Sequence, residues 1–148
     1  MFQKSLSTVA GVALAIALLA GVSFAQVTTI PGSGCPRAPV PQFVGTPGIG
    51  QSIGVICPQS PPPGADFVIL GAAGRPIVFD PPLACLPGCV LACDPLEIVT
   101  GNSWRAQIPN DRNLIGACFC VQCGSVQRDP TGRACIMLSA ALQVCITR

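Results

Sequence analysis

The chain has 148 residues, a formal net charge of +2, and charged side chains at only 9% of its positions. This balance gives no electrostatic basis for binding nucleic acid or an anionic membrane surface. The sequence contains no histidine, which removes the commonest general base and the commonest metal ligand. Sixteen prolines and sixteen glycines predict many turns, whereas the hydrophobic content of 50% argues against intrinsic disorder.

Residues 1–25 have the three-part layout of a secretory signal peptide, with Lys4 as the positive charge and Ser23-Phe24-Ala25 as the cleavage site. The apolar run over residues 9–22 is about 14 residues long, whereas a membrane span needs about 20. An uncleaved membrane anchor is therefore the less favoured alternative. We expect a signal helix that is removed and a secreted, extracellular protein, with the periplasm or the cell surface as other destinations.

Beyond the signal peptide the length suits one domain and not two. We expect a short N-terminal segment over residues 26–34 and a disulfide-rich domain over residues 35–148. Short β-prone segments separated by turn residues recur along this part of the chain. In chain order they are 27–30, 40–45, 51–57, 65–71, 77–79, 96–100, 103–108, 114–122, 134–138 and 141–146.

The connections between these segments carry clear turn signals. Residues 61–63 are three prolines and predict a stiff exposed loop, and residues 83–93 predict a cysteine-rich connection. Asp129-Pro130-Thr131-Gly132 predicts a type I turn. The pattern favours an all-β fold, an antiparallel β-sandwich of eight to ten short strands with several disulfides, and a barrel is the alternative.

All ten cysteines follow the signal peptide. In an oxidising compartment an even number of cysteines in a small domain predicts disulfides, here five, although the sequence leaves their pairing open. Two cysteines that are two positions apart on a strand point to the same face, so Cys118 and Cys120 are expected to bond to other segments. The ten are Cys35, Cys57, Cys85, Cys89, Cys93, Cys118, Cys120, Cys123, Cys135 and Cys145.

Two other readings of the cysteines compete with disulfides. Cys120-Val121-Gln122-Cys123 has the spacing of a redox motif, but its flanks predict strand and turn and not the helix start that lowers a thiol pKa. Cys118, Cys120, Cys123 and Cys135 could supply an all-thiolate metal site, which oxidation disfavours outside the cell. We therefore expect no metal and no cofactor.

Catalytic chemistry has little support in the sequence. The six acidic residues are dispersed and most adjoin proline, glycine or asparagine, which is typical of turn formation. A Ser-His-Asp triad is impossible without histidine. Trp104, next to Arg105, is a weak candidate for stacking on a sugar, although a lone tryptophan in an alternating strand is more often a core residue. We expect that the protein is not an enzyme.

Short motifs recur at the turns and strands of the chain. They are Gly34-Cys35-Pro36, residues 64–71, Pro87-Gly88-Cys89, residues 104–116, Phe119, Gln122 and residues 138–142. Together these motifs resemble a family of exported bacterial β-sandwich domains of unknown function, abundant in planctomycetes and often found at the C-terminus of larger secreted proteins. The resemblance implies a β-sandwich without known catalytic residues and a bond between Cys35 and Cys89. The family usually has no cysteine at positions 118, 120 and 123.

The sequence predicts a secreted, non-enzymatic structural or surface-associated protein. So few charges leave neutral or apolar faces exposed, which favours self-association or binding to the cell envelope. One alternative is an adhesion module that binds carbohydrate or protein through Trp104 and Arg105. The other is a thiol-based metal or redox protein. We expect no nucleic-acid partner and no membrane span in the mature form.

Overall fold

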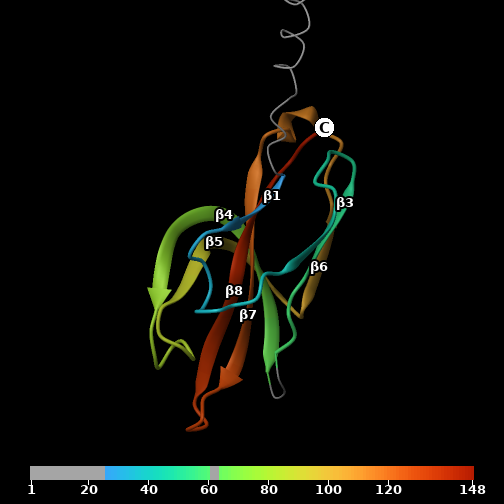
Figure 1. The fold of residues 1–148 in the computed structure, drawn as a ribbon. Helices are drawn as coiled ribbons and strands as arrows, with labels where there is room; N and C mark the ends of the chain where they lie inside the picture. Colours follow the sequence, from blue (N-terminus) through green and yellow to red (C-terminus); the bar gives the residue numbers. More distant parts are fainter. Residues whose placement is uncertain (1–25, 61–63) are drawn as a thin grey trace, which may run out of the picture.

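Eight strands and a short 3-10 helix form the part of the chain that the computed structural model describes, residues 26–60 and 64–148 (Figure 1). The predicted signal peptide and the three prolines at 61–63 lie outside the described residues. The elements are β1 (Val27–Ile30), β2 (Gln42–Gly45), β3 (Ser52–Ile56), β4 (Ala65–Phe79), β5 (Cys89–Thr100), β6 (Ser103–Gln107), η2 (Arg112–Leu114), β7 (Cys118–Arg128) and β8 (Ala134–Cys145).

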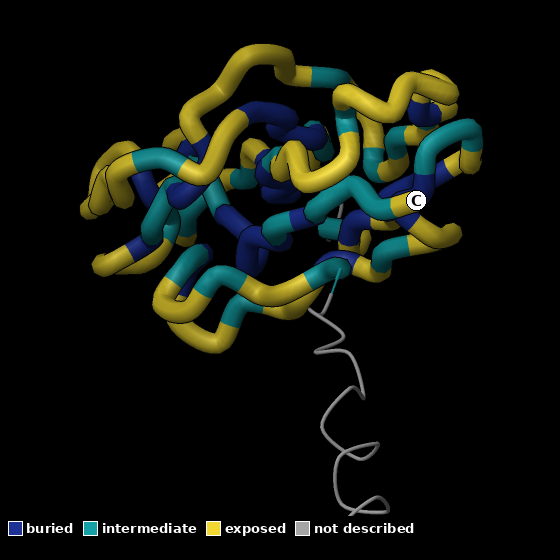
Figure 2. The backbone as a smooth tube through the Cα atoms, turned by 90° about the horizontal axis from the view of Figure 1, so that it is seen from above, coloured by how far each residue is buried: buried dark blue, intermediate teal, exposed yellow. Residues whose placement is uncertain are grey.

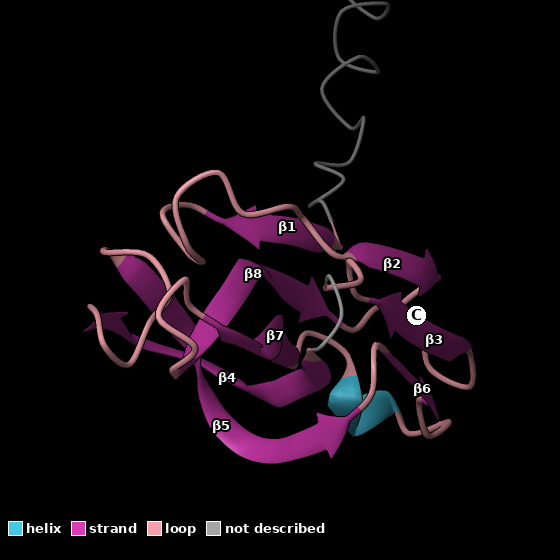
Figure 3. Ribbon diagram, turned by 90° about the horizontal axis from the view of Figure 1, so that it is seen from below, coloured by secondary structure: helices cyan, strands magenta, loops and turns pink. Residues whose placement is uncertain are grey.

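The strands form two antiparallel sheets in a sandwich-like arrangement (Figure 3). The larger sheet has the order β1-β8-β7-β4-β5, and the smaller has the order β2-β3-β6. The predicted all-β fold class is therefore confirmed. The segment at residues 26–34 contributes β1 to the larger sheet, where Val27 pairs with Val144.

Several strands are longer than the sequence predicts. The expected strands at 65–71 and 77–79 are one continuous β4, and the expected strands at 134–138 and 141–146 lie largely within β8. The last part of the cysteine-rich connection at 83–93, from Cys89 on, belongs to β5. The reason is that the residues expected to end β4 lie at register shifts, where the strand bends without reversing direction.

The long β4–β5 strand pair bends back over the larger sheet. Glycines allow the bend, because a Cβ atom at Gly71 would overlap the carbonyl oxygen of Asp94. Beyond the bend β5 reaches other parts of the chain, and Val90 forms a β-bridge with Gly34. Figure 1 shows β4 as an arch running from green to yellow, with β5 beside it.

Both faces of the larger sheet are covered. Successive residues of β4 point to opposite sides of the sheet, and residues on each side are buried in an apolar cluster. Val68 and Leu70 face the smaller sheet and pack in one apolar cluster with Val55 and Val121. Ile69 faces the other way and packs in a second cluster beneath the bent part of β5. The other buried members of this cluster are Cys35, Ala84, Cys89, Ala92, Cys93, Cys120, Leu138 and Ala141. Figure 2 shows the buried segments inside a largely exposed periphery (Figure 2).

Candidate binding surface and disulfide framework

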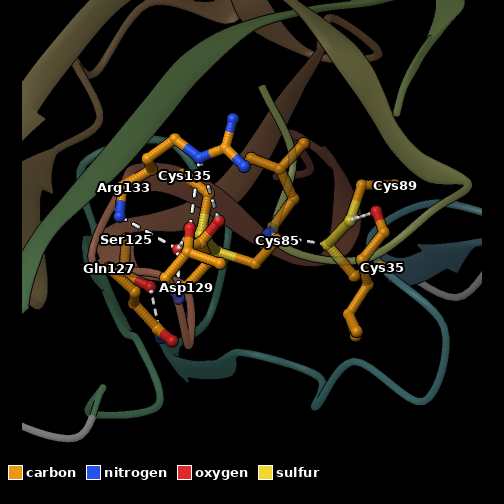
Figure 4. Close-up of a disulfide and its surroundings, with 11 residues drawn as sticks. Cys35, Cys85, Cys89, Ser125, Gln127, Asp129, Arg133 and Cys135 are labelled. Atoms are coloured by element: carbon orange, nitrogen blue, oxygen red, sulfur yellow. Dashed lines mark hydrogen bonds and ion pairs between the residues drawn. A yellow bond between two sulfur atoms is a disulfide. The ribbon is translucent and has the colours of Figure 1, made fainter. Parts of the chain in front are cut away.

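The ten cysteines, all of which lie in the described residues, form five disulfides and leave no free thiol. The prediction of five bridges is confirmed. The bond implied by the family resemblance, Cys35–Cys89, is present (Figure 4). The other four are Cys57–Cys123, Cys85–Cys135, Cys93–Cys120 and Cys118–Cys145.

Strand β7 is the centre of this framework. Its three cysteines bond to three different segments: Cys118 to the end of β8, Cys120 to β5, and Cys123 to Cys57 just after β3. The expectation that Cys118 and Cys120 bond elsewhere and not to each other is confirmed. The Cys-x-x-Cys pair at 120 and 123 is also not bonded to itself, so it does not form a redox dithiol in this structure.

The bridges also bear on metal binding and location. No thiolate remains to ligate a metal, and the described part of the chain contains no cluster of three potential metal-binding side chains. Five disulfides are consistent with an extracellular or other non-cytoplasmic protein. Within the described residues, no helix has the length and apolar character that crossing a membrane requires.

Gln122 is a buried polar residue to which sequence reasoning assigned no role. Its side chain is 0% exposed. The Nε2 amide donates hydrogen bonds to the carbonyl oxygens of Val90 and Ser139, each at 2.9 Å, and Oε1 accepts one from the Ala92 N–H at 3.0 Å. The signal in the sequence is a lone amide in an otherwise apolar strand segment, which predicts a buried hydrogen-bonding role.

Trp104 and Arg105 lie on opposite faces of β6. Trp104 is half-buried and packs edge-on against Phe119, with 6.4 Å between the ring centroids. Arg105 is exposed and pairs with Gly54 on β3. A Cβ atom added to Gly54 would lie 3.1 Å from the Arg105 Cγ, so the Arg105 side chain lies over this glycine. Adjacent strand residues point to opposite sides of a sheet. The structure therefore does not bring the two candidate ligand-binding side chains onto one surface.

Trp104 lines an apolar groove of about 330 Å³ between the two sheets. Leu70, Leu96 and Phe119 also line it. Of the described residues in its wall, Glu97 alone is charged. Glu97 pairs with the buried Leu70 on β4, so its side chain lies on the side of the sheet that faces β6.

Two acidic residues at turns, Asp129 and Asp111, hold the local backbone through hydrogen bonds. Asp129 Oδ1 accepts hydrogen bonds from the Thr131 hydroxyl at 2.6 Å and from the N–H groups of Thr131 and Arg133 at 2.8 and 2.9 Å. The Thr131 hydroxyl first, and then the Arg133 N–H, lower the pKa of Asp129 below its usual 3.8. Asp111 caps η2 by accepting a hydrogen bond from the Asn113 N–H at 2.9 Å.

Exposed apolar side chains lie along β4, β5 and the loop that joins them. Leu96 is 85% exposed, and Val78 and Ile98 are each 59% exposed. We call these side chains the apolar patch. Its members are Ile77, Val78, Leu83, Leu86, Leu96 and Ile98.

Comparison with known proteins does not identify a relative of this chain. No protein-family model, no curated protein and no solved structure matches the chain. The family resemblance suggested by the short motifs therefore stays a prediction.

Proposed function

We propose that the protein is an exported, non-enzymatic structural protein that associates through the apolar patch with further copies of itself or with the cell envelope. The observation that carries the proposal is the exposure of Leu96, Val78 and Ile98 on one strand pair. Fully burying one such side chain stabilises a complex by about 1.5–3 kcal/mol. Large exposed apolar surfaces mark interaction sites in soluble proteins.

The disulfides support the proposal because they hold β5 in place, so that its exposed apolar side chains cannot fold back into the protein interior. Cys35–Cys89 fixes the start of β5, and Cys93–Cys120 fixes its middle to β7. The apolar side chains on β5 are therefore attached to a strand that is covalently held in place. Covering them requires a second surface.

Two features of β5 favour association through side chains over pairing of strand edges. β5 is the last strand of its sheet, so one of its edges has no neighbouring strand in the sheet. Pro95 has no N–H to donate there, and Glu97 places a charge on the inner side of the edge strand. Both devices oppose the addition of another strand.

Light scattering of the purified exported protein over a concentration series tests the proposal, together with co-sedimentation with isolated envelopes. We expect self-association or envelope binding, and we expect Leu96→Ser with Val78→Ser to reduce it. Val126→Ser is the matched control, because Val126 is an exposed apolar residue on β7 outside the patch. A monodisperse monomer at high concentration that does not bind envelopes would contradict the proposal.

The groove beside Trp104 supports a second function, binding of carbohydrate or protein as an adhesion module. Trp104→Ala should abolish binding on a glycan or protein array while the disulfide map stays unchanged. Arg105→Ala is the control, because Arg105 lies on the opposite face of β6 and should leave binding intact. Equal loss of binding in both variants would remove the groove as the site.

A further inference from the structure

We infer that the Cys118–Cys145 bridge is a site of thiol–disulfide exchange, at which small aliphatic thiols such as glutathione form a mixed disulfide with the folded protein. This chemistry is independent of the proposed association, since it takes place at a single bond on one molecule. The bridge joins two residues that are directly paired across β7 and β8.

Exposure separates this bridge from the other four. Cys118 is exposed and Cys145 is half-buried. Every other bridge contains a cysteine that is nearly inaccessible: Cys89 and Cys120 are 0% exposed, and Cys123 and Cys135 are 3% exposed. Exchange needs a thiolate to reach a sulfur atom, so access selects which disulfide reacts in the folded state.

The surroundings of the bridge suit an attacking thiolate. Both cysteines line an apolar groove of about 540 Å³ at the end of the larger sheet, enough for a small ligand. Arg148 lines the same groove, and none of the described residues in its wall is acidic. A neighbouring cation favours a thiolate over a thiol, so Arg148 supports both the incoming and the departing sulfur anion.

The reaction proceeds in two steps. The small-molecule thiolate attacks the Sγ of Cys118, the more exposed of the two residues. The protein S–S bond breaks, and the Cys145 sulfur leaves as a thiolate that takes a proton from water. A second thiolate then attacks the sulfur of the attached small molecule. Cys118 leaves as a thiolate and is protonated in its turn. Two small thiols have then been oxidised to one small disulfide, and the protein bridge has gained the two electrons and two protons.

Opening this bridge leaves its surroundings held by other contacts. The Gly116 N–H donates to the Ile146 oxygen, and the Ile146 N–H donates to the Ala117 oxygen, both at 2.8 Å. The Cys145 N–H donates to the Gln26 oxygen, also at 2.8 Å. The strand ends therefore stay paired after reduction, so exchange can occur without global unfolding.

Graded glutathione treatment of the folded protein, followed by alkylation and peptide mapping, tests the inference. We expect Cys118 and Cys145 to be alkylated at least about tenfold faster than the other eight cysteines, with a glutathione adduct on Cys118 as the intermediate. Alkylation of another pair first, or of all ten together, would overturn it.

Three variants sharpen the experiment. Cys118→Ser with Cys145→Ser should remove adduct formation while the four other bridges remain, and an undiminished adduct yield in this variant would contradict the inference. Arg148→Glu should slow exchange several-fold, whereas Arg75→Glu makes the same charge change in the outer part of β4 and should not. Equal rates in both charge variants would count against the role given to the groove.

Discussion

At the residue scale, the Gln122 amide links the bent part of β5 to the rest of the larger sheet by hydrogen bonds. It connects β7, which carries it, to Val90 and Ala92 on β5 and to Ser139 on β8. The desolvation of a buried amide is offset because both of its polar atoms have partners. One side chain therefore joins three strands.

Replacing Gln122 by leucine should destabilise the protein by about 3 kcal/mol, because it removes these bonds and leaves the buried Ala92 N–H and the buried Ser139 carbonyl without this partner. Denaturant unfolding of the oxidised protein measures the change. Gln127→Leu is the matched control, since Gln127 lies on the same strand, is only half-buried, and bonds to the Ser125 hydroxyl. Equal stability of the two variants would contradict this account.

At this scale the sequence predicts which residues have a structural or binding role, but not which partners their side chains contact. The number of cysteines and the predicted signal peptide are enough to predict their oxidised state, but their partners depend on which strands lie side by side. Trp104 and Arg105 were grouped because they are neighbours in the chain. Strand geometry instead puts them on opposite faces, and the groove beside Trp104 is completed by Glu97 from β5.

At the element scale, the bend of β4 and β5 decides how the sheet is covered. The sequence predicts breaks at the glycines and proline of residues 71–76, since these residues usually end strands. In the structure they fall within a strand whose pairing shifts register twice. Local turn propensity could not reveal this, because residues 73–79 pair with residues 89–93, which the sequence marks only as part of a cysteine-rich connection.

Two alanine substitutions test the bend. A Cβ at Gly71 would overlap the backbone carbonyl of Asp94, whereas a Cβ at Gly74 would overlap only the Asp94 carboxylate, which can rotate away. We expect Gly71→Ala to destabilise by about 2–3 kcal/mol and Gly74→Ala by clearly less. Thermal unfolding of the two variants measures the difference, and the reverse order would show that the close approach at Gly71 is not needed.

At the scale of the whole molecule, the fold class could be predicted from two local patterns. Apolar and polar residues alternate along short segments, and turn residues recur between these segments, as is typical of antiparallel strands. The assignment of strands to two sheets could not, since it depends on contacts between residues far apart in the chain. Cys57–Cys123 is one such contact. It ties the residue that follows β3 in the smaller sheet to β7 in the larger one, across a separation of 66 residues.

Removing this bridge with Cys57→Ser and Cys123→Ser should cost about 4 kcal/mol by the loop-entropy relation for its separation of 66 residues. Removing Cys118–Cys145, with a separation of 27 residues, should cost less, about 3.5 kcal/mol by the same relation. Denaturant unfolding under non-reducing conditions compares the two double variants. A larger loss for the shorter loop would show that chain entropy does not govern these bridges.

The five bridges overlap along the chain, so every peptide bond between Cys35 and Cys145 is enclosed by at least one of them. A single cut by a protease anywhere in this interval leaves both pieces covalently attached. The nicked protein would migrate as one species until a reductant separated the fragments. Damage that would dismantle an ordinary secreted domain therefore cannot by itself shed a piece of this one.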